Sequence, residues 1–431
     1  MKYKKNIISN VILHILSIGI GFATSILIAR GLGPTNQGEF SFYVLIFGLI
    51  ASYGHFGITT STSYFMKRSK YIDEDVVNTN ATILIILSII YFVTIVLLRN
   101  IVFSSNIVLF ITIWTIYFVS LTLSTFLMNV YMANENVYVY NRYLILIHIL
   151  KAILICPLFF VNSLNIITVS IIYALLEVIK LVLMIKGINA RFKFKVNCKL
   201  LKEELKYGIP LYLSALFLYL NYRVDQIMIK SYLNNTELGI YALSVTLAEL
   251  AKMVPDSVVS AFTGKLYNCD ENEKKNIVVK TIKLSFYMTV LISIIGVLCK
   301  PLITILYGTD YARAGLSMII LLIGIPFLTI GKVSSVYFYT NGKTNIHMNI
   351  ALAVLLINLG LNFLLIPKMG INGAALTSTL SYIFYGIVYL IFLNRYGIRA
   401  KDIIIIYKKD IELLKKYFSK LARRLRRVKN A

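Results

Sequence analysis

Charged side chains interrupt several long apolar segments of this sequence. The clearest example, FLYLNYRVDQIMIKSYL at residues 217–233, carries Arg223 and Asp225 among apolar and aromatic residues. A cationic side chain there could hold a phosphate, and a carboxylate could bind a coupling cation. In a helix the two positions lie roughly 200° apart, so they cannot simply neutralise each other. Arg223 instead shares its face with Tyr212, Tyr219, Gln226 and Lys230.

Other apolar segments carry charges at helical spacing. Glu249, Lys252 and Asp256 lie on one face of ALSVTLAELAKMVPDSVVSAF, and the adjacent Pro255 predicts a kink. Glu249 and Lys252 could also form a local ion pair. Three further segments carry Tyr173 with Glu177 and Lys180, His148 with Lys151, and Lys332 after GIPFLTIG.

Ionisable residues within a membrane usually face a bundle interior or a water-filled cavity, because exposure to lipid is costly. The cations therefore predict one polar interior that binds an anionic cargo, and the carboxylates are candidates for coupling transport to a cation. For any single residue, a structural ion pair or an interhelical hydrogen bond remains the alternative. The candidate cargo-binding residues in these segments are Lys151, Arg223, Gln226, Lys252 and Lys332, and the candidate coupling residues are Glu177, Asp225, Glu249 and Asp256.

Catalysis and metal binding find little support in the sequence. The cysteines, Cys156, Cys198, Cys269 and Cys299, are scattered without a CxxC spacing or a companion histidine cluster. An enzyme acting on a lipid-linked sugar would need placed acids and bases, and the predicted outer loops hold no paired acidic motif. We expect no catalytic residues, no metal and no cofactor.

The elements that must position these charges are membrane-spanning helices. The 431 residues are 58% hydrophobic and 15% charged, with a mean hydropathy of +0.76, and apolar runs of about 20 residues recur along the chain. We predict an all-α integral membrane protein with about twelve spans. These lie near residues 6–32, 37–66, 78–98, 104–132, 138–160, 164–186, 207–231, 237–264, 281–306, 311–340, 346–366 and 371–394.

The distribution of basic residues predicts the orientation. The formal charge of +25 would suggest nucleic acid for a soluble protein, but most of the 44 basic residues lie in one set of loops and in the tails. The positive-inside rule then places both termini in the cytoplasm of a cell-membrane protein, with no nucleic-acid partner. The first apolar run is too long for a signal peptide. The tail is predicted to be a basic amphipathic helix on anionic inner-leaflet lipid, or else a coiled-coil partner.

The spans divide into two sets of six. The longest inner connection follows the sixth span, so both halves have the same orientation, as in parallel repeats with a pseudo-twofold axis along the membrane normal. LGPTNQGEFS and LNNTELGIYA match at Leu32/Leu233, Thr35/Thr236 and Gly38/Gly239. The predicted units are an N-terminal lobe at 1–190, a basic linker at 191–206, a C-terminal lobe at 207–394 and the tail at 395–431.

Several stretches in the expected order resemble one transporter family. They are ARGLGPTNQGEFSFY, YGIPLYLSALFLYLNYRVDQIMI, ELGIYALSVTLAEL, LYGTDYARAG and NGKTNIHMNIALAVLLINLGLNFLLIPKMGINGAALTSTLSY. Up to about residue 395, the chain resembles the polysaccharide transporters of the multidrug/oligosaccharidyl-lipid/polysaccharide exporter superfamily.

The resemblance implies a flippase that moves undecaprenyl-diphosphate-linked oligosaccharide to the outer face, for O-antigen or capsule assembly. It implies alternating access between two six-helix lobes, with Na⁺ or H⁺ as a candidate coupling ion and a polysaccharide polymerase as a candidate partner. By motif position it carries over Arg30 and Arg223 as cargo-binding residues, together with Asp225.

Other functions are weaker alternatives. Lipid II flippases usually carry two further spans after the twelfth, where this chain has a basic tail, and multidrug exporters of the superfamily are expected to rely more on acidic cavity residues. A membrane polymerase or glycosyltransferase would need a larger outer domain. A scaffold without transport activity would gain nothing evident from buried charges.

Overall fold

The described part of the chain is built from helices. The computed structural model describes residues 2–68, 71–99, 107–134, 136–188, 192–267 and 269–405, and no strand occurs among them. The first half contains α1 (Lys2–Tyr53), α2 (Ile58–Arg68), α3 (Asp73–Leu97), α5 (Ile107–Ala133), α6 (Val137–Phe160) and α7 (Ile166–Ile188). The second half contains α8 (Cys198–Tyr232), α9 (Asn235–Tyr267), α10 (Glu271–Leu298), α11 (Lys300–Tyr307), the 3-10 turn η1 (Thr309–Tyr311), α12 (Ala314–Thr340), α13 (Thr344–Arg395) and α14 (Ala400–Ile404).

The helices account for the twelve predicted spans. Among the described residues, nine helices are long and apolar enough to cross a membrane. Two of these are 52-residue helices that each contain two spans, because Gly33 (φ 69°) and Gly370 (φ 59°) interrupt the helical backbone at sharp reversals. α8 is 35 residues long but is not among these nine helices, because it contains many polar residues. It nevertheless packs among the other helices.

Two predicted span boundaries differ from the structure. The ninth span was wrong at its end, because α10 stops at Leu298 and the short α11 begins at Lys300. The second span, predicted to be continuous over 37–66, breaks into α1 and α2 at a turn that runs from Gly54 to Gly57. The predicted amphipathic face of the tail lies outside the described residues.

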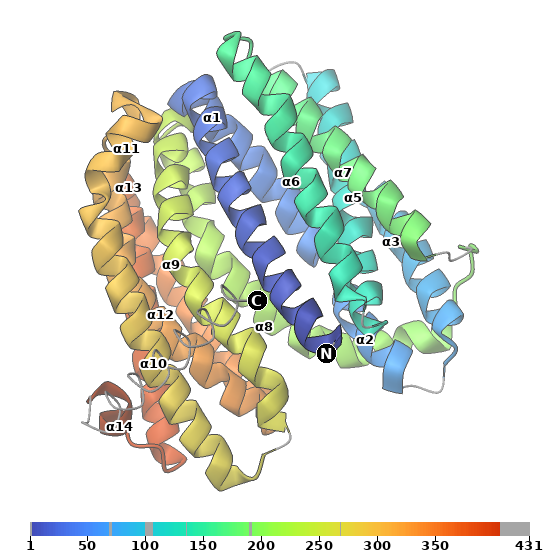
Figure 1. Cartoon of the computed structure of the whole chain (residues 1–431), viewed down its shortest axis with the longest axis vertical. Helices are drawn as coiled ribbons and strands as arrows, with labels where there is room; N and C mark the ends of the chain where they lie inside the picture. Colours follow the sequence, from blue (N-terminus) through green and yellow to red (C-terminus); the bar gives the residue numbers. More distant parts are fainter. Residues whose placement is uncertain are drawn as a thin grey trace, which may run out of the picture.

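Two lobes stand side by side (Figure 1). Helices α1 to α7 form the N-lobe, where apolar cores gather around Trp114 and around Phe126. Helices α8 to α14 form most of the C-lobe, whose cores gather around Tyr241 and around Tyr337. We call the end of the bundle that contains Gly33 and α11 the hairpin end, and the end that contains residues 192–197 and the start of α8 the linker end. In Figure 1 the hairpin end is uppermost.

Equivalent residues of the two halves meet at the hairpin end. The hydroxyls of Thr35 and Thr236, 201 positions apart, are hydrogen-bonded at 2.8 Å. A methyl group on Gly38 would overlap the carbonyl oxygen of Asn235, and one on Gly239 would overlap the carbonyl oxygen of Pro34, which is the same contact seen from the other side. This reciprocity confirms the pseudo-twofold repeat.

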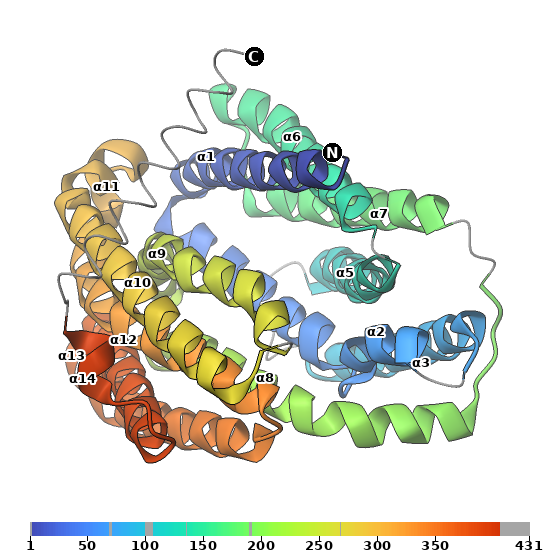
Figure 2. The ribbon, with the colours of Figure 1, turned by 60° about the horizontal axis from the view of Figure 1, so that its bottom comes forward.

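The contact at the linker end is not reciprocal. Residues 192–197 run extended along α3, where the backbone N–H groups of Lys193, Lys195 and Asn197 donate to the side chains of Asn78, Thr82 and Thr79. The start of α8 then lies against α2 and α3 before the helix continues into the C-lobe (Figure 2). Where α8 crosses the α1–α2 turn, a Cβ on Gly208 would lie 2.7 Å from the Gly57 carbonyl oxygen.

Candidate functional site

Five charged side chains from α8, α9 and α12 form one ionic cluster. The Arg223 guanidinium lies 3.1 Å from a Glu249 carboxylate oxygen, and Lys252 lies 2.5 Å from the other oxygen. Asp256, one turn further along α9, pairs with Lys332 of α12. The ring of Tyr222 lies between the two lysines, with Lys252 Nζ at 4.6 Å and Lys332 Nζ at 5.7 Å from its centroid. We call these five charges the C-lobe ionic cluster.

The cluster has one more positive charge than negative. Three cations face two carboxylates, and the pairing of Glu249 with both Arg223 and Lys252 leaves neither cation a carboxylate of its own. The Arg223 side chain is 27% exposed and Lys252 17%. Charge-assisted hydrogen bonds are strong in a medium of low dielectric. An anionic group that reached the cluster would therefore meet donors already positioned by Glu249.

Asp225 makes hydrogen bonds rather than an ion pair with Arg223, as the helical geometry predicted, and it lines one small cavity with Tyr222, Glu249 and Lys252. One carboxylate oxygen accepts a hydrogen bond from Tyr241 of α9 at 2.5 Å and one from Ser378 of α13 at 2.9 Å. The other oxygen accepts from the backbone N–H of Gln226 at 2.7 Å. Asp225 is 2% exposed, so this carboxylate joins three helices in the interior of the C-lobe.

A chain of buried amides and hydroxyls extends from Ser378 into the first half of α13. The Ser381 hydroxyl donates to the Ser378 carbonyl, Asn358 donates to Ser381, and Asn362 donates to Asn358 at 2.7 Å. All four of these residues are fully buried. Together with Asp225 they make an oxygen-rich polar path inside an otherwise apolar lobe.

Some oxygen atoms near this path accept no hydrogen bond. They are the side-chain oxygens of Asn221, Asn362 and Thr377, and each is buried. Buried acceptors without donors are uncommon and are satisfied by water or by a cation. Carboxylate, amide and hydroxyl oxygens suit a hard cation, whereas the described residues hold no cluster of His, Cys, Asp and Glu of the kind that binds a transition metal.

The N-lobe carries a smaller group of charges on α6 and α7. Lys151 of α6 lies 3.5 Å from the hydroxyl of Tyr173 on α7, and 4.8 Å from the centroid of its ring. Glu177 and Lys180 pair within α7, and both are buried. Lys151 therefore has an aromatic neighbour rather than a carboxylate as its partner.

The structure brings together only part of the predicted site. Arg223, Glu249, Lys252, Asp256 and Lys332 form the C-lobe ionic cluster, while Lys151, Glu177 and Lys180 lie in the other lobe. Gln226 is buried beside Asp225 rather than in the cluster, and Lys230 hydrogen-bonds Asn235. Arg30 is exposed near the hairpin end.

Sequence reasoning missed the partners of Asp225 and an aromatic contact between the lobes. Tyr53, the last residue of α1, packs its ring 4.7 Å from that of Tyr219 and 6.3 Å from that of Tyr212 on α8. The pair of asparagines Asn358 and Asn362, spaced four apart in the apolar span 346–366, was a signal that could have been found. No spacing or motif in the sequence indicated that Tyr241 and Ser378 donate hydrogen bonds to Asp225.

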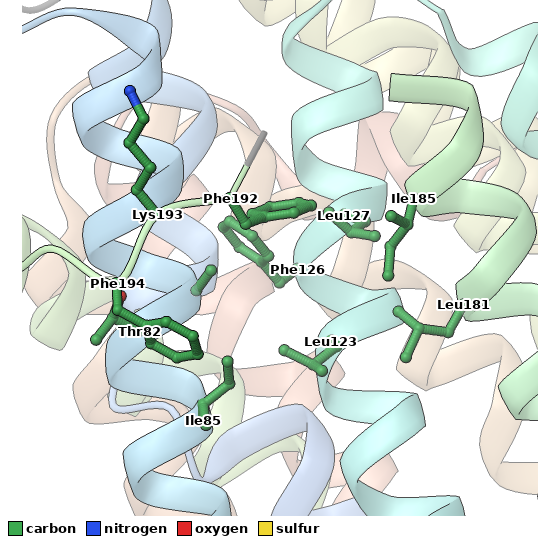
Figure 3. Close-up of a pocket in the computed structure, with 11 residues that line it drawn as sticks. Thr82, Ile85, Leu123, Phe126, Leu127, Leu181, Ile185, Phe192, Lys193 and Phe194 are labelled. Carbon is green, nitrogen blue, oxygen red and sulfur yellow. The ribbon is translucent and has the colours of Figure 1, made fainter. Parts of the chain in front are cut away.

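An apolar pocket of about 170 Å³ lies away from these charges. Residues from α3, α5, α7 and the extended segment line it, including Ile85, Leu123, Phe126 and Phe194 (Figure 3). Figure 3 shows the ammonium group of Lys193 pointing away from these apolar side chains. A pocket lined in this way offers nothing to a sugar or a phosphate.

Comparison with known sequences identifies the family. The profile of the family described as polysaccharide biosynthesis protein matches residues 3–263, and that of the MatE family matches residues 210–364. The chain belongs to the polysaccharide biosynthesis protein family. This family agrees with the resemblance to polysaccharide transporters that the sequence showed.

Curated relatives of this family member match over limited lengths. The capsular polysaccharide biosynthesis protein CapF of Staphylococcus aureus is 27% identical over 215 residues, which cover 49% of this chain and 54% of the relative. An uncharacterized membrane protein of Methanocaldococcus jannaschii is 32% identical over 117 residues, covering 26% of this chain and 23% of the relative. The chain thus spans about half, or less, of the curated relatives it matches.

Solved structures share the fold of this polysaccharide biosynthesis family member. An inward-facing multidrug resistance MATE family transporter superposes with a TM-score of 0.71 at 13% identity, over 88% of this chain and 94% of that one. The lipid II flippase MurJ in an inward closed conformation gives 0.70 at 15% identity, over 96% and 93%. The chain therefore has the two-lobe, all-α membrane fold of these transporters.

Proposed function

We propose that this protein is a flippase that carries an undecaprenyl-diphosphate-linked oligosaccharide across the cytoplasmic membrane for surface polysaccharide assembly. The observation that carries the proposal is the C-lobe ionic cluster, whose excess positive charge lies within the membrane-spanning helices. A diphosphate is anionic and needs such a partner inside a membrane. The hairpin end would face outward and both termini would face the cytoplasm, in accord with the positive-inside rule.

Each part of the cargo has a matching feature. Arg223, Lys252 and Lys332 would hold the diphosphate, and Lys151 beside Tyr173 offers a cation from the opposite lobe. The rings of Tyr53, Tyr212 and Tyr219 lie together between the lobes, where they could pack against sugar rings. Arg30, exposed near the hairpin end, would receive the headgroup late in transport.

Alternating access would use the two lobe contacts in turn. The hairpin-end contact combines close glycine contacts and the threonine pair with buried packing, in which Ala29 joins a C-lobe core and the Tyr311 hydroxyl donates to the Ala29 carbonyl oxygen. A polyprenyl tail could stay in lipid beside the opening while the headgroup passes between the lobes.

Asp225 is the best candidate to couple transport to a cation. It is buried in an oxygen-rich path and has no ion pair among the described residues, whereas Glu177, Glu249 and Asp256 already neutralise cations. The ion would be Na⁺ or H⁺. Binding there would bias how α8, α9 and α13 pack, and hence which end of the protein is open.

The cargo-binding proposal is tested by changing Arg223 to alanine. Since a hydrogen bond to a charged group contributes about 1.5–3 kcal/mol, we expect export to fall at least about tenfold. Surface polysaccharide would be measured in a deletion strain that carries the variant, with membrane levels checked by blotting. Arg142→Ala, an exposed arginine on α6, is the matched control. Normal surface polysaccharide with Arg223→Ala would refute a cargo role for the residue.

The coupling proposal is tested by Asp225→Asn, with the exposed Asp310→Asn as control. Amide replacement keeps the shape of the side chain but removes its charge, so transport in proteoliposomes should lose its dependence on an imposed Na⁺ or proton gradient. Separate Na⁺ and proton gradients identify the ion. A variant that responds to the same gradient as the wild type would remove Asp225 from the coupling mechanism.

A multidrug exporter is the second candidate, favoured by the MatE profile over residues 210–364 and by the MATE-like fold. Such a protein would move cationic drugs, for which a site with excess positive charge is unsuited. Efflux of a cationic dye from proteoliposomes, together with failure to move lipid-linked oligosaccharide, would favour this alternative. A lipid II flippase is separated in the same assay by replacing the oligosaccharide cargo with lipid II.

A further inference from the structure

A buried glutamate lies where α8 crosses from one lobe to the other. The first turns of α8 lie against the N-lobe, and Leu200 and Glu204 are both fully buried there. One Glu204 carboxylate oxygen accepts a hydrogen bond from Asn80 Nδ2 of α3 at 2.9 Å. The same amide nitrogen donates to Thr62 of α2 at 3.1 Å, so both of its hydrogens are used. One side chain thus ties α2, α3 and α8 together.

The second oxygen of Glu204 has no hydrogen-bond partner, and neither has the carbonyl oxygen of the Asn80 side chain. Two buried acceptors therefore lie in one small contact that lacks a donor. An ionised carboxylate held by a single hydrogen bond is a costly arrangement in a protein interior. A proton on Glu204 would remove the charge and supply the missing donor.

No cation in the described structure compensates this carboxylate. Its hydrogen-bond partner is Asn80 of α3, whose amide also binds Thr62 of α2. Tyr71, just before α3, hydrogen-bonds Glu203 and interacts electrostatically with both glutamates. Nearby charges interact with other groups. Lys67, Lys202 and Lys206 are exposed, and Glu74 and Asp75 pair with Lys193 and Lys195.

Burial raises the pKa of Glu204 to about 7, and the Asn80 hydrogen bond offsets only part of that shift.

We propose that Glu204 is a proton-binding site that controls how firmly the start of α8 is held on the N-lobe. With the proton bound, the contact with Asn80 and Thr62 is neutral and stable. Without it, the carboxylate gains by moving to water, which releases the first turns of α8. The close crossing of Gly208 over Gly57 lies one turn further along and serves as the pivot. The proton is thus a second ligand of the transporter, separate from any cation at Asp225.

The direction of the pH effect follows from linkage. The free carboxyl has an ordinary pKa of 4.5, and the docked one titrates near 7. The docked form therefore binds more protons, so docking weakens as pH rises between these values and stays constant above the higher one. The equilibrium constant for docking should fall by up to about tenfold per pH unit, or about 300-fold in total.

The proposal rests on the proposed function only for its role in transport, because docking can be measured without cargo. Spin labels would replace the exposed Ile72 before α3 and the exposed Lys206 on α8, in a full-length chain whose four native cysteines have been removed. Electron spin resonance in nanodiscs then gives the fraction with the short, docked distance. In the wild type this fraction should fall as pH rises from 4.5 to about 7 and change little above that.

Two variants separate the proton from other causes. Glu204→Gln keeps the shape of the protonated side chain, so the docked fraction should stay high at every pH. Glu203→Gln makes the same change one residue away, at a side chain that is not fully buried, and should titrate like the wild type.

A pH-independent docked fraction in the wild type, or a Glu204→Gln variant that titrates like the wild type, would overturn the proposal. If Glu204→Gln fails to fold, the wild-type titration beside that of Glu203→Gln still decides it. Transport of lipid-linked oligosaccharide is assayed separately. If neither the wild type nor any variant moves lipid-linked oligosaccharide while docking titrates as expected, the proposed cargo is wrong. The proton site at Glu204 would still stand.

Discussion

The two ends of the molecule join the same two lobes by opposite means. At the hairpin end, Thr35 meets Thr236 and Gly38 meets Gly239, so each lobe offers the same small residues to the other. At the linker end, an extended segment and the start of α8 lie on α2 and α3 through buried polar groups that have no counterpart across the pseudo-twofold axis. The first contact combines close glycine packing with hydrogen bonds between Thr35 and Thr236 and from Tyr311 to Ala29, whereas the second also depends on a titratable carboxyl.

In the proposed transport cycle, this difference gives the two ends different tasks. The glycine contacts at the hairpin end have no side-chain rotamers to order, so this part of the interface can close again at little cost in conformational entropy. The linker-end contact depends on pH because it contains the buried carboxyl of Glu204. It cannot separate completely because the linker joins the two lobes covalently. We therefore expect substitutions at the hairpin end to act through overlap, and those at the linker end to act through strain, hydrogen bonding and pH.

The largest effect should come from Gly38→Ala. The added methyl would overlap the Asn235 carbonyl oxygen on a rigid backbone, and overpacking of this kind costs about 1–3 kcal/mol. We expect the hairpin end to favour its open form by roughly 5- to 150-fold. Disulfide formation between cysteines placed at Thr35 and Thr236 should fall accordingly. Gly48→Ala, where a methyl meets no atom within 4 Å, should leave the cross-link unchanged.

An intermediate effect is expected for Gly57→Ala at the linker end. Gly57 has a φ of 89°, and a Cβ there would lie 2.8 Å from the Gly208 backbone, so conformational strain adds to overlap. We expect a loss of about 1–2 kcal/mol in stability, seen as a lower thermal unfolding midpoint in detergent. Gly360→Ala, in open space within a helix, should be neutral or slightly stabilising. Equal midpoints for the two variants would show that the crossing is loose.

The smallest effect should come from the threonine pair. Replacing Thr35 and Thr236 with valine, singly and together, removes one exposed hydrogen bond that contributes about 0.5–1 kcal/mol. A double-mutant cycle on the open–closed equilibrium, measured by spin-label distances at the hairpin end, gives the coupling energy. A coupling energy above about 1.5 kcal/mol would mean that polar contacts, and not shape alone, hold this end closed.

The sequence predicted the parts of the structure that depend on local pattern. Span lengths follow from runs of apolar residues, and the separation of Arg223 from Asp225 follows from the pitch of a single helix. The sequence showed a short match around Thr35 and Thr236, but it did not show that these residues contact each other. Only the folded chain shows that matching residues touch one another.

What the sequence could not supply are contacts between helices far apart in the chain. Tyr241, Ser378 and Asp225 come from three different helices, and no spacing relates them. The break at residues 54–57 was missed because two glycines in an apolar run fit a continuous helix as well as a turn. Glu204 lies within the predicted basic linker at 191–206, and its burial beside the exposed Lys202 and Lys206 had no signal in the sequence.

The reciprocal contact at Gly38 and Gly239 also bears on how the chain arose. Residues that contact their own equivalents across a twofold axis are what a symmetric homodimer uses. Two copies of a six-helix ancestor with equal orientation could have met through this surface before their genes joined. The linker-end contact has no such origin, because it needs the connection between the halves. We infer that the hairpin end is the older of the two interfaces, and that the contact at Glu204 followed the fusion.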